Sequence, residues 1–253
     1  MNGWGVWTLF VKEVRRFWSV LVQTVLAPVV TTLLYLLVFG HVLQEGGVAF
    51  SGVAYAHFLI PGLIMMALMQ NAFANSSSSL LQSKMHGNLT FILLAPLSPW
   101  EFYLAFVAAA VVRGLVVGGV IFLVGWLVYG LTWQSAGWII LFALLSAAVM
   151  GALGLLAGIL ADKYDHLAAF QNFIIVPLTF LSGVFYSIHR LPEAWQWASH
   201  LNPFFYMVDG FRYGFFLQSD VAVGVSLAVT SGFLLFVSGV NLWLLTKGVK
   251  IRH

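Results

Sequence analysis

Few residues of this chain are of the kinds that carry out chemistry, and the most unusual of them is Arg113. It lies inside a long apolar stretch, 12 residues after Glu101. At 1.5 Å of rise per helical residue, this places Arg113 roughly 18 Å into a membrane-crossing helix, where a charge is costly. Two interpretations stay open: Arg113 contacts an anionic substrate or a water-filled route, or it pairs with polar groups at a helix interface.

A stripe of amides and hydroxyls is the second polar feature of the apolar part of the chain. Asn71, Asn75, Ser78 and Gln82 recur at helical spacing, so a helix places them near one face. Such a face does not turn toward lipid. Hydrogen bonding between helices is one interpretation, and the lining of a transport pathway is the other. Asn71, Asn75 and Arg113 are therefore our possible pathway residues.

Motifs for catalysis, metal binding or nucleotide binding are missing from the sequence. Cysteine is absent, which excludes disulfides, thiolate metal sites and cysteine catalysis. No two histidines are spaced four residues apart, and there is no Gly-x-Ser-x-Gly, His-Glu-x-x-His or phosphate-binding Gly-x-x-x-x-Gly-Lys-Ser/Thr motif. We expect no metal site, no cofactor in this chain and no ATP hydrolysis by it. An intramembrane enzyme would need several convergent titratable groups, and only Arg113 is buried so deeply.

The composition explains why these polar residues are so isolated. Hydrophobic residues make up 61% of the chain and charged residues 8%, whereas soluble domains have about 45–50% and 25%. Mean hydropathy is +0.97. So few charges cannot cover a water-soluble surface, so lipid must be a main contact of this chain. The net charge of +3 comes from basic residues that flank apolar runs, which indicates membrane topology and no nucleic-acid partner.

Stretches free of charge predict the elements that hold these residues. We expect an all-α polytopic membrane protein, a single transmembrane domain over residues 1–253 with six transmembrane helices. A turn-rich segment at 130–137 divides the longest apolar stretch into two spans. The predicted spans cover 20–42, 57–80, 102–129, 138–160, 167–187 and 222–245.

Basic residues in the short connections predict the orientation. With a cytoplasmic amino terminus, eight basic residues lie inside and only Arg190 and Arg212 lie outside, which is a clear positive-inside bias. Both termini are then cytoplasmic, and the number of spans is even. The eight inner residues are Lys12, Arg15, Arg16, Lys84, Lys163, Lys247, Lys250 and Arg252.

Three segments outside the spans have a character of their own. Residues 1–19 read as an interfacial amphipathic helix, with tryptophans at helical spacing and the charges mostly on another side. The inner loop 84–99 contains a short apolar run at 88–95, closed by two prolines, which needs cover from the membrane or from a soluble partner.

The third segment is the aromatic-rich outer stretch 188–220. Pro192-Glu193 and Asn202-Pro203 are both typical helix starts, so we expect two short helices there. Neither is long enough to cross a membrane. We expect a re-entrant hairpin that dips into the outer leaflet.

These pieces together resemble the permease subunits of ABC-2 type ABC transporters, in particular the bacterial YadH-like group. The resemblance covers nearly the whole chain and is most specific in its last stretch. The stretches that carry it are Phe58-Leu59-Ile60-Pro61-Gly62-Leu63-Ile64-Met65-Met66, Asn71-Ala72-Phe73-Ala74-Asn75, Leu93-Leu94-Ala95-Pro96, Arg113-Gly114, Pro177-Leu178-Thr179-Phe180-Leu181-Ser182-Gly183-Val184-Phe185-Tyr186-Ser187 and Leu201-Asn202-Pro203-Phe204-Phe205-Tyr206-Met207-Val208-Asp209-Gly210-Phe211-Arg212-Tyr213-Gly214.

The resemblance implies an ATP-driven exporter in the bacterial inner membrane. Two permease copies, as a homodimer in membrane lipid, would work with two separate ABC ATPase subunits that hold ATP and Mg²⁺. The loop 84–99 would be the coupling helix, although relatives often carry acidic residues where this chain has Thr90-Phe91. The implied coupling residues are His86, Asn88, Leu89, Phe91, Leu93 and Pro96, and those of the outer re-entrant segment are Asn202, Pro203, Asp209 and Arg212.

A different class of function stays open beside this one. An ATP-independent secondary transporter or channel would usually show intramembrane carboxylates, or broken helices in paired halves, and neither stands out in the sequence.

Overall fold

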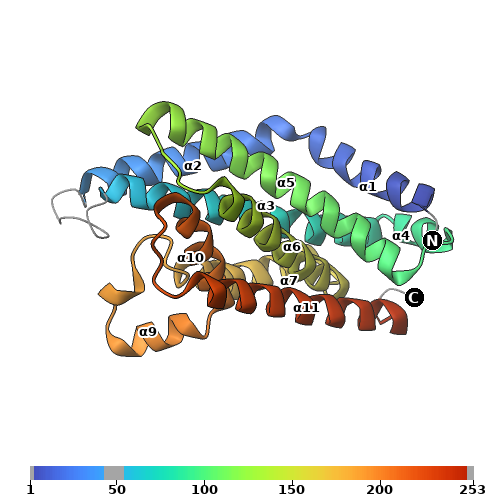
Figure 1. Ribbon diagram of the computed structural model, residues 1–253. Coiled ribbons are helices and arrows are strands. Elements are labelled where there is room, and N and C mark those ends of the chain that lie inside the picture. Colours follow the sequence, from blue (N-terminus) through green and yellow to red (C-terminus); the bar gives the residue numbers. More distant parts are fainter. Residues whose placement is uncertain (1–2, 43–53, 250–253) are drawn as a thin grey trace.

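The computed structural model describes residues 3–42 and 54–249, and every regular element in these ranges is helical. The long helices run side by side as an elongated bundle (Figure 1). The elements are α1 (Gly3–Trp18), α2 (Leu21–Val42), α3 (Tyr55–Met85), α4 (Asn88–Leu94), α5 (Pro99–Tyr129), α6 (Ala136–Leu160), α7 (Tyr164–Phe170), the π-helix η2 (Gln171–Ile175), α8 (Val176–Phe180), the 3₁₀ turn η3 (Ile188–Arg190), α9 (Glu193–His200), α10 (Pro203–Phe216) and α11 (Val223–Lys247).

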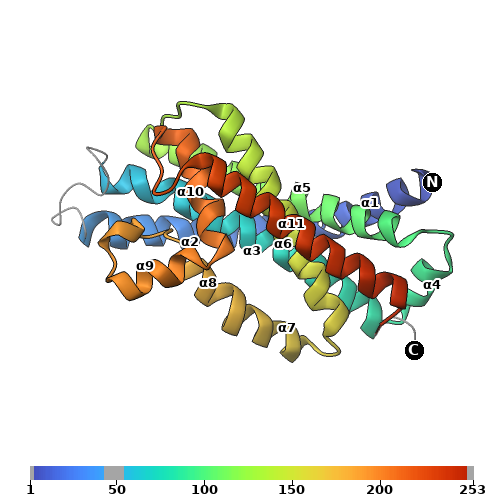
Figure 2. The same ribbon diagram turned by 60° about the horizontal axis from the view of Figure 1, so that its bottom comes forward.

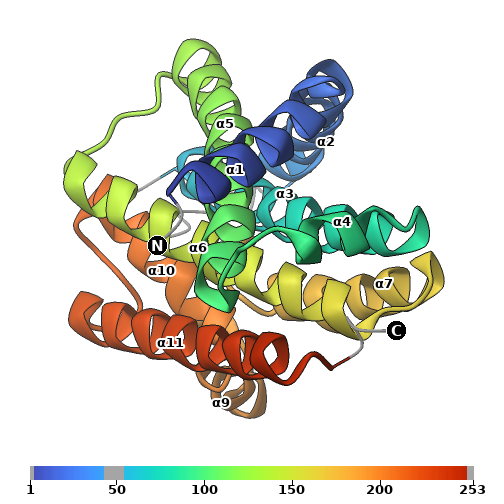
Figure 3. The ribbon, with the colours of Figure 1, turned by 90° about the vertical axis from the view of Figure 1, so that its right-hand side faces the viewer.

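Helices α3 and α6 form the centre of the bundle, and small residues let them approach closely. A side chain on Gly154 of α6 would collide with the backbone of Phe73 in α3, and one on Gly158 would meet Leu80 at 3.1 Å. Without a hydrophobic drive between helices in lipid, close backbone packing of this kind holds them together. Figure 3, which looks along the bundle, shows the other helices arranged around this pair.

Five helices within the described residues are long and apolar enough to cross a membrane: α2, α3, α5, α6 and α11. Their positions confirm five of the predicted spans, with differences of a few residues at the ends. The predicted span 167–187 is different. It corresponds to a 17-residue helical run at 164–180, made of α7, η2 and α8, and the chain then turns at 181–187. Six spans are therefore a proposal.

The two ends of the bundle differ in character. One end of the bundle holds the beginning of α1, the end of α11 and the whole of α4. The other end holds α9 and α10 (Figures 1 and 2). We call these the α4 end and the α9 end. Lys250 and Arg252, which were counted as inner basic residues, lie outside the described residues.

The short helices form where the sequence predicts them. Helix α4 follows a left-handed turn at Gly87, and the Asn202 side chain caps α10 by accepting a hydrogen bond from the Phe204 N–H at 3.0 Å. Pro203 is the first residue of α10, where its missing N–H costs nothing. Helix α9 begins at Glu193, directly after Pro192.

Candidate functional site

Helix α4 exposes an apolar surface at the α4 end. The side chains of Phe91 and Leu94 are 74% and 76% exposed, and that of Leu93 is 41% exposed. Leu89 is buried and Ile92 packs against the core, so one side of this short helix is anchored to the bundle while the other is left uncovered. Of the six implied coupling residues, His86, Asn88, Phe91, Leu93 and Pro96 are exposed and Leu89 is buried.

Helix α4 is tied to the central helices through the end of α3. Lys84, in the last turn of α3, donates hydrogen bonds to the backbone carbonyls of Ile159 and Ala161 at the end of α6. A lysine there satisfies carbonyls that have no partner within their own helix. Because only Gly87 and its neighbours separate α3 from α4, a displacement of α4 acts directly on this joined pair.

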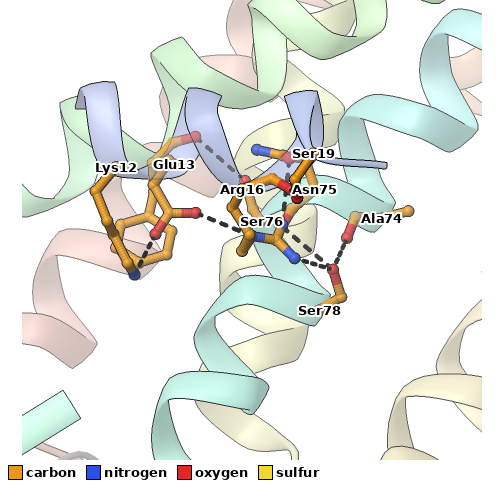
Figure 4. Close-up of polar contacts among 9 residues, drawn as sticks. Lys12, Glu13, Arg16, Ser19, Ala74, Asn75, Ser76 and Ser78 are labelled. Carbon is orange, nitrogen blue, oxygen red and sulfur yellow. Dashed lines mark hydrogen bonds and ion pairs between the residues drawn. The ribbon is translucent and has the colours of Figure 1, made fainter. Parts of the chain in front are cut away.

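An ionic cluster around the buried Glu13 connects α1 to α3 (Figure 4). The Arg16 guanidinium donates to the backbone carbonyl of Asn75 at 2.8 Å, to its side-chain oxygen at 3.3 Å and to Ser78 Oγ at 3.4 Å. Glu13 is completely buried and pairs with Lys12 Nζ at 2.7 Å and Arg16 Nε at 3.6 Å. Burial lowers the pKa of Arg16, and the neighbouring Glu13 opposes that change.

This cluster gives α1 a different orientation from the one that its tryptophans suggest. Its buried residues are Leu9, Glu13 and Phe17, whereas Trp4, Trp7 and Trp18 are exposed. The pattern of the sequence predicts that Glu13 and Arg16 are charges that lie away from the apolar stripe. Both in fact turn into the bundle, where Arg16 meets the polar stripe of α3 and Glu13 pairs with Arg16.

Each of the three possible pathway residues takes part in a contact between an arginine and an asparagine of α3. The Arg113 guanidinium donates to the Asn71 side-chain oxygen at 3.3 Å, and Asn71 donates to the Ala67 carbonyl at 3.0 Å. Asn75 is fully buried beneath Arg16. In this arrangement the stripe of α3 makes contacts between helices, and a role in a pathway remains a prediction.

At the α9 end, Arg212 is a buried anchor. It is 2% exposed, donates to the carbonyls of Gly183 and Val184 at 2.9 and 3.4 Å, and lies 3.9 Å from the ring centre of Phe58. Arg212, counted among the outer basic residues, is thus a buried side chain of α10. The positive-inside bias keeps the same direction when Arg212 is left out of the count.

Asp209 and Asn202 complete this anchor. Asp209 accepts hydrogen bonds from the N–H groups of Asp220 and Val221 at 2.7 and 3.4 Å, and from Ser226 at 3.2 Å. Burial raises its pKa to about 6, against the opposing effect of the Asp220 hydrogen bond. The Asn202 amide donates to the Leu178 carbonyl at 2.6 Å. Helix α10 is thus bonded to the segments before and after it.

Comparison with known proteins identifies the family of this chain. The family model for the ABC-2 type transporter matches residues 5–216. The inner membrane transport permease YadH of Escherichia coli K12 is 36% identical over 229 residues, which is 90% of this chain and 89% of that protein.

More distant relatives show the same correspondence. Nodulation protein J of Rhizobium meliloti is 22% identical over 212 residues, 83% of this chain and 81% of that protein. Nodulation protein J of Sinorhizobium fredii is 28% identical over 166 residues, 64% of this chain and 62% of that protein. With a family model that extends over most of its length and a relative of 36% identity that it covers almost fully, this chain belongs to the ABC-2 type transporter family and is a membrane transport permease.

Proposed function

We propose that this chain is the transmembrane subunit of an ATP-driven exporter, which moves substrate across the bacterial inner membrane with a separate ATPase subunit. ATP and Mg²⁺ are bound by that partner, because this sequence contains no phosphate-binding loop. Family membership supports a permease of an ABC transporter. The observation that carries the rest is the uncovered apolar side of α4, with Phe91 and Leu94 about three-quarters exposed.

A partner that covers this surface must lie at the α4 end. Three exposed apolar side chains on a seven-residue helix form a small apolar patch beside the exposed polar residues His86 and Asn88. Burial of a Phe or Leu side chain stabilises a complex by roughly 1.5–3 kcal/mol. A cleft on an ATPase subunit that receives Phe91 and Leu94 would therefore hold the two proteins together and grip α4.

Six crossings fit this arrangement. The helical run 164–180 would extend roughly 26 Å at 1.5 Å per residue, close to the roughly 30 Å of a bilayer core. With this run as the fifth crossing, α1 and the end of α11 share the α4 end, as Figure 1 shows for the two helices. This end is then cytoplasmic, and the α9 end, with α9 and α10 as the re-entrant segment, faces outward.

A second copy of the chain would cover another uncovered surface. Gln23 and Thr31 of α2 and Asn172 of η2 are exposed polar residues within apolar helices. Polar side chains at such positions face protein or water and avoid lipid. A homodimer that joins these helices would shelter them, and the route for substrate would lie between or within the two copies, with Asn71, Asn75 and Arg113 as its possible contacts.

The mechanism follows from the way α4 is attached. ATP binding draws the two ATPase subunits together, and each carries α4 with it. Because Lys84 joins α3 to α6 at this end, a displacement of α4 moves α3 and α6 together as one body. The helices then change between two packing arrangements, one open to each side of the membrane.

The test is purification of the tagged chain from native membranes, with a Phe91→Ser/Leu94→Ser double variant and Leu201→Ser as the control. Leu201 is 66% exposed, similar to the two α4 residues, and follows α9 at the opposite end. We expect an ABC ATPase to copurify at a one-to-one ratio with wild type and with the Leu201 variant. The double variant should lose the ATPase while remaining monodisperse.

Two outcomes would contradict the proposal. An ATPase that stays bound to the double variant would remove α4 from the interface. Transport by the purified chain with no ATPase present would favour the alternative, an ATP-independent secondary transporter or channel.

A further inference from the structure

We propose that a wedge-shaped groove between α5 and α6, at the α9 end, binds one acyl chain of a membrane phospholipid. We call this groove the wedge. The wedge has a volume of about 420 Å³, within the range of roughly 300–1,000 Å³ for small-molecule sites. This inference requires only that the chain lies in a membrane, and it is independent of the ATPase partner. The wedge is lined by Ile64, Leu68, Leu115, Gly118, Gly119, Phe122, Trp133, Ala136, Ile139, Ile140, Ala143, Leu144 and Phe211.

The wedge forms because α5 and α6 touch at one level and separate at another. Nearer the α4 end, a Cβ on Gly151 of α6 would lie 2.8 Å from the side chain of Ala110 in α5. About two and a half turns further along α5, a Cβ on Gly119 would meet no atom within 4 Å. The two helices are therefore in contact near Ala110 and apart near Gly119.

The start of α6 is held away from α5 by its attachment to α10. The N–H groups of Gln134 and Ser135 donate to the Gly214 carbonyl at 3.1 and 2.8 Å. A Cβ on Gly214 would lie only 2.9 Å from the Ile139 nitrogen, so α6 sits directly on α10. These bonds fix the separation, and the wedge is part of the fold.

The lining and the position of the wedge indicate its occupant. Every lining residue is apolar, aromatic or glycine, apart from the indole N–H of Trp133. The walls are candidate membrane spans, so the medium beside the wedge is the hydrocarbon of the bilayer. An empty wedge would leave its walls without the dispersion contacts that a chain of methylenes provides.

Trp133 marks the end of the wedge that would face a lipid headgroup. Its ring lies 5.4 Å from that of Phe122, centre to centre, in the connection between α5 and α6. Tryptophan is favoured at the membrane–water boundary because its ring is apolar and its N–H is polar. We assign the acyl chain to the leaflet at the α9 end, with its ester region near Trp133.

Gly119 allows a direct test, because its open side faces the wedge. In Gly119→Leu the added Cβ meets no neighbour within 4 Å, and the rest of the side chain would occupy the wedge. Ala136→Leu fills it from the opposite wall. Gly239→Leu is the matched control, since Gly239 lies in the spanning helix α11 and a Cβ there also meets nothing within 4 Å.

The experiment reconstitutes each variant in vesicles that contain phosphatidylcholine with a photoreactive diazirine in one acyl chain. After irradiation, mass spectrometry locates the labelled peptides. In wild type and Gly239→Leu, we expect labelling of 115–122 and 136–144 well above that of the lipid-facing side of α11. In Gly119→Leu and Ala136→Leu, it should fall to the α11 level.

Three other labelling results would each overturn the proposal. Equal labelling of the wedge and of α11 in wild type would mean ordinary lipid contact only. Labelling that survives both filling variants would place the lipid elsewhere. A wedge that is unlabelled in wild type would be occupied by protein, for instance by a second copy. Melting temperatures in detergent close to that of Gly239→Leu show that the filling variants are folded.

Discussion

Gly62 gives a sharp test of how the α9 end is packed. A Cβ at this position in α3 would lie 2.6 Å from the Val184 carbonyl oxygen, about 0.8 Å short of ordinary contact, which begins at 3.4 Å. It would also lie 3.2 Å from Arg212 Nη2. Gly62→Ala must therefore move the backbone of the 181–187 turn, and with it one acceptor of the buried Arg212.

The cost can be compared with a matched substitution. Overpacking costs about 1–3 kcal/mol, and the Arg212 hydrogen bond adds to this. Alanine also stabilises a helix by up to about 1 kcal/mol relative to glycine. Gly239→Ala has the same gain, and its Cβ meets no atom within 4 Å. The difference between the two variants therefore measures the packing cost at Gly62. At roughly 2–4 °C per kcal/mol for a chain of this size, Gly62→Ala should melt about 2–12 °C below Gly239→Ala.

The assay is thermal unfolding of the two variants in the same detergent, followed by the loss of monodisperse protein on size-exclusion chromatography. A Gly62→Ala protein that melts at or above Gly239→Ala would refute the packing of α3 against the 181–187 turn. It would also weaken the assignment of Arg212 as an anchor, because both rest on the same contact.

Substitutions at Arg212 and at the Arg16–Glu13 pair examine the charges inside the bundle. Arg212→Met leaves the carbonyls of Gly183 and Val184 without their donor and should cost about 1.5–3 kcal/mol, whereas Arg212→Lys keeps the charge and should lose less. Equal melting temperatures of Arg212→Met and wild type would argue against the anchor. Arg16→Gln strands part of the Glu13 charge and should cost about 1–3 kcal/mol, and adding Glu13→Gln should restore some of it. A double-mutant cycle with no coupling energy would separate the two residues.

The spans were predictable because length and hydropathy decide them locally. The prediction 138–160 differs by two residues from α6, Ala136–Leu160. The cap of α10 was also predictable, since Asn followed by Pro has its effect within one turn. Helix α4 was recognised from its prolines and its short apolar run.

The partners of long charged side chains were not predictable in the same way. Arg16 and Arg212 read as cations near membrane boundaries, but each bonds to a segment far away in sequence: Arg16 to α3, and Arg212 to the 181–187 turn. Their type and local spacing do not reveal these contacts. The run 164–180 ends seven residues before the predicted span because the chain turns at 181–187, where Gly183 has a positive φ, and hydropathy does not record that turn.

The π-helix at Gln171–Ile175 has a consequence for any helical-wheel drawing of this run. One extra residue in a turn advances the residues after it by about 100° around the axis, since an α-helix has 3.6 residues per turn. Side chains of α7 and α8 that a uniform wheel would align, such as Leu167 and Leu178, therefore belong to different azimuths. Excising a single residue there would rotate α8 relative to α7 while leaving the composition of the segment almost the same.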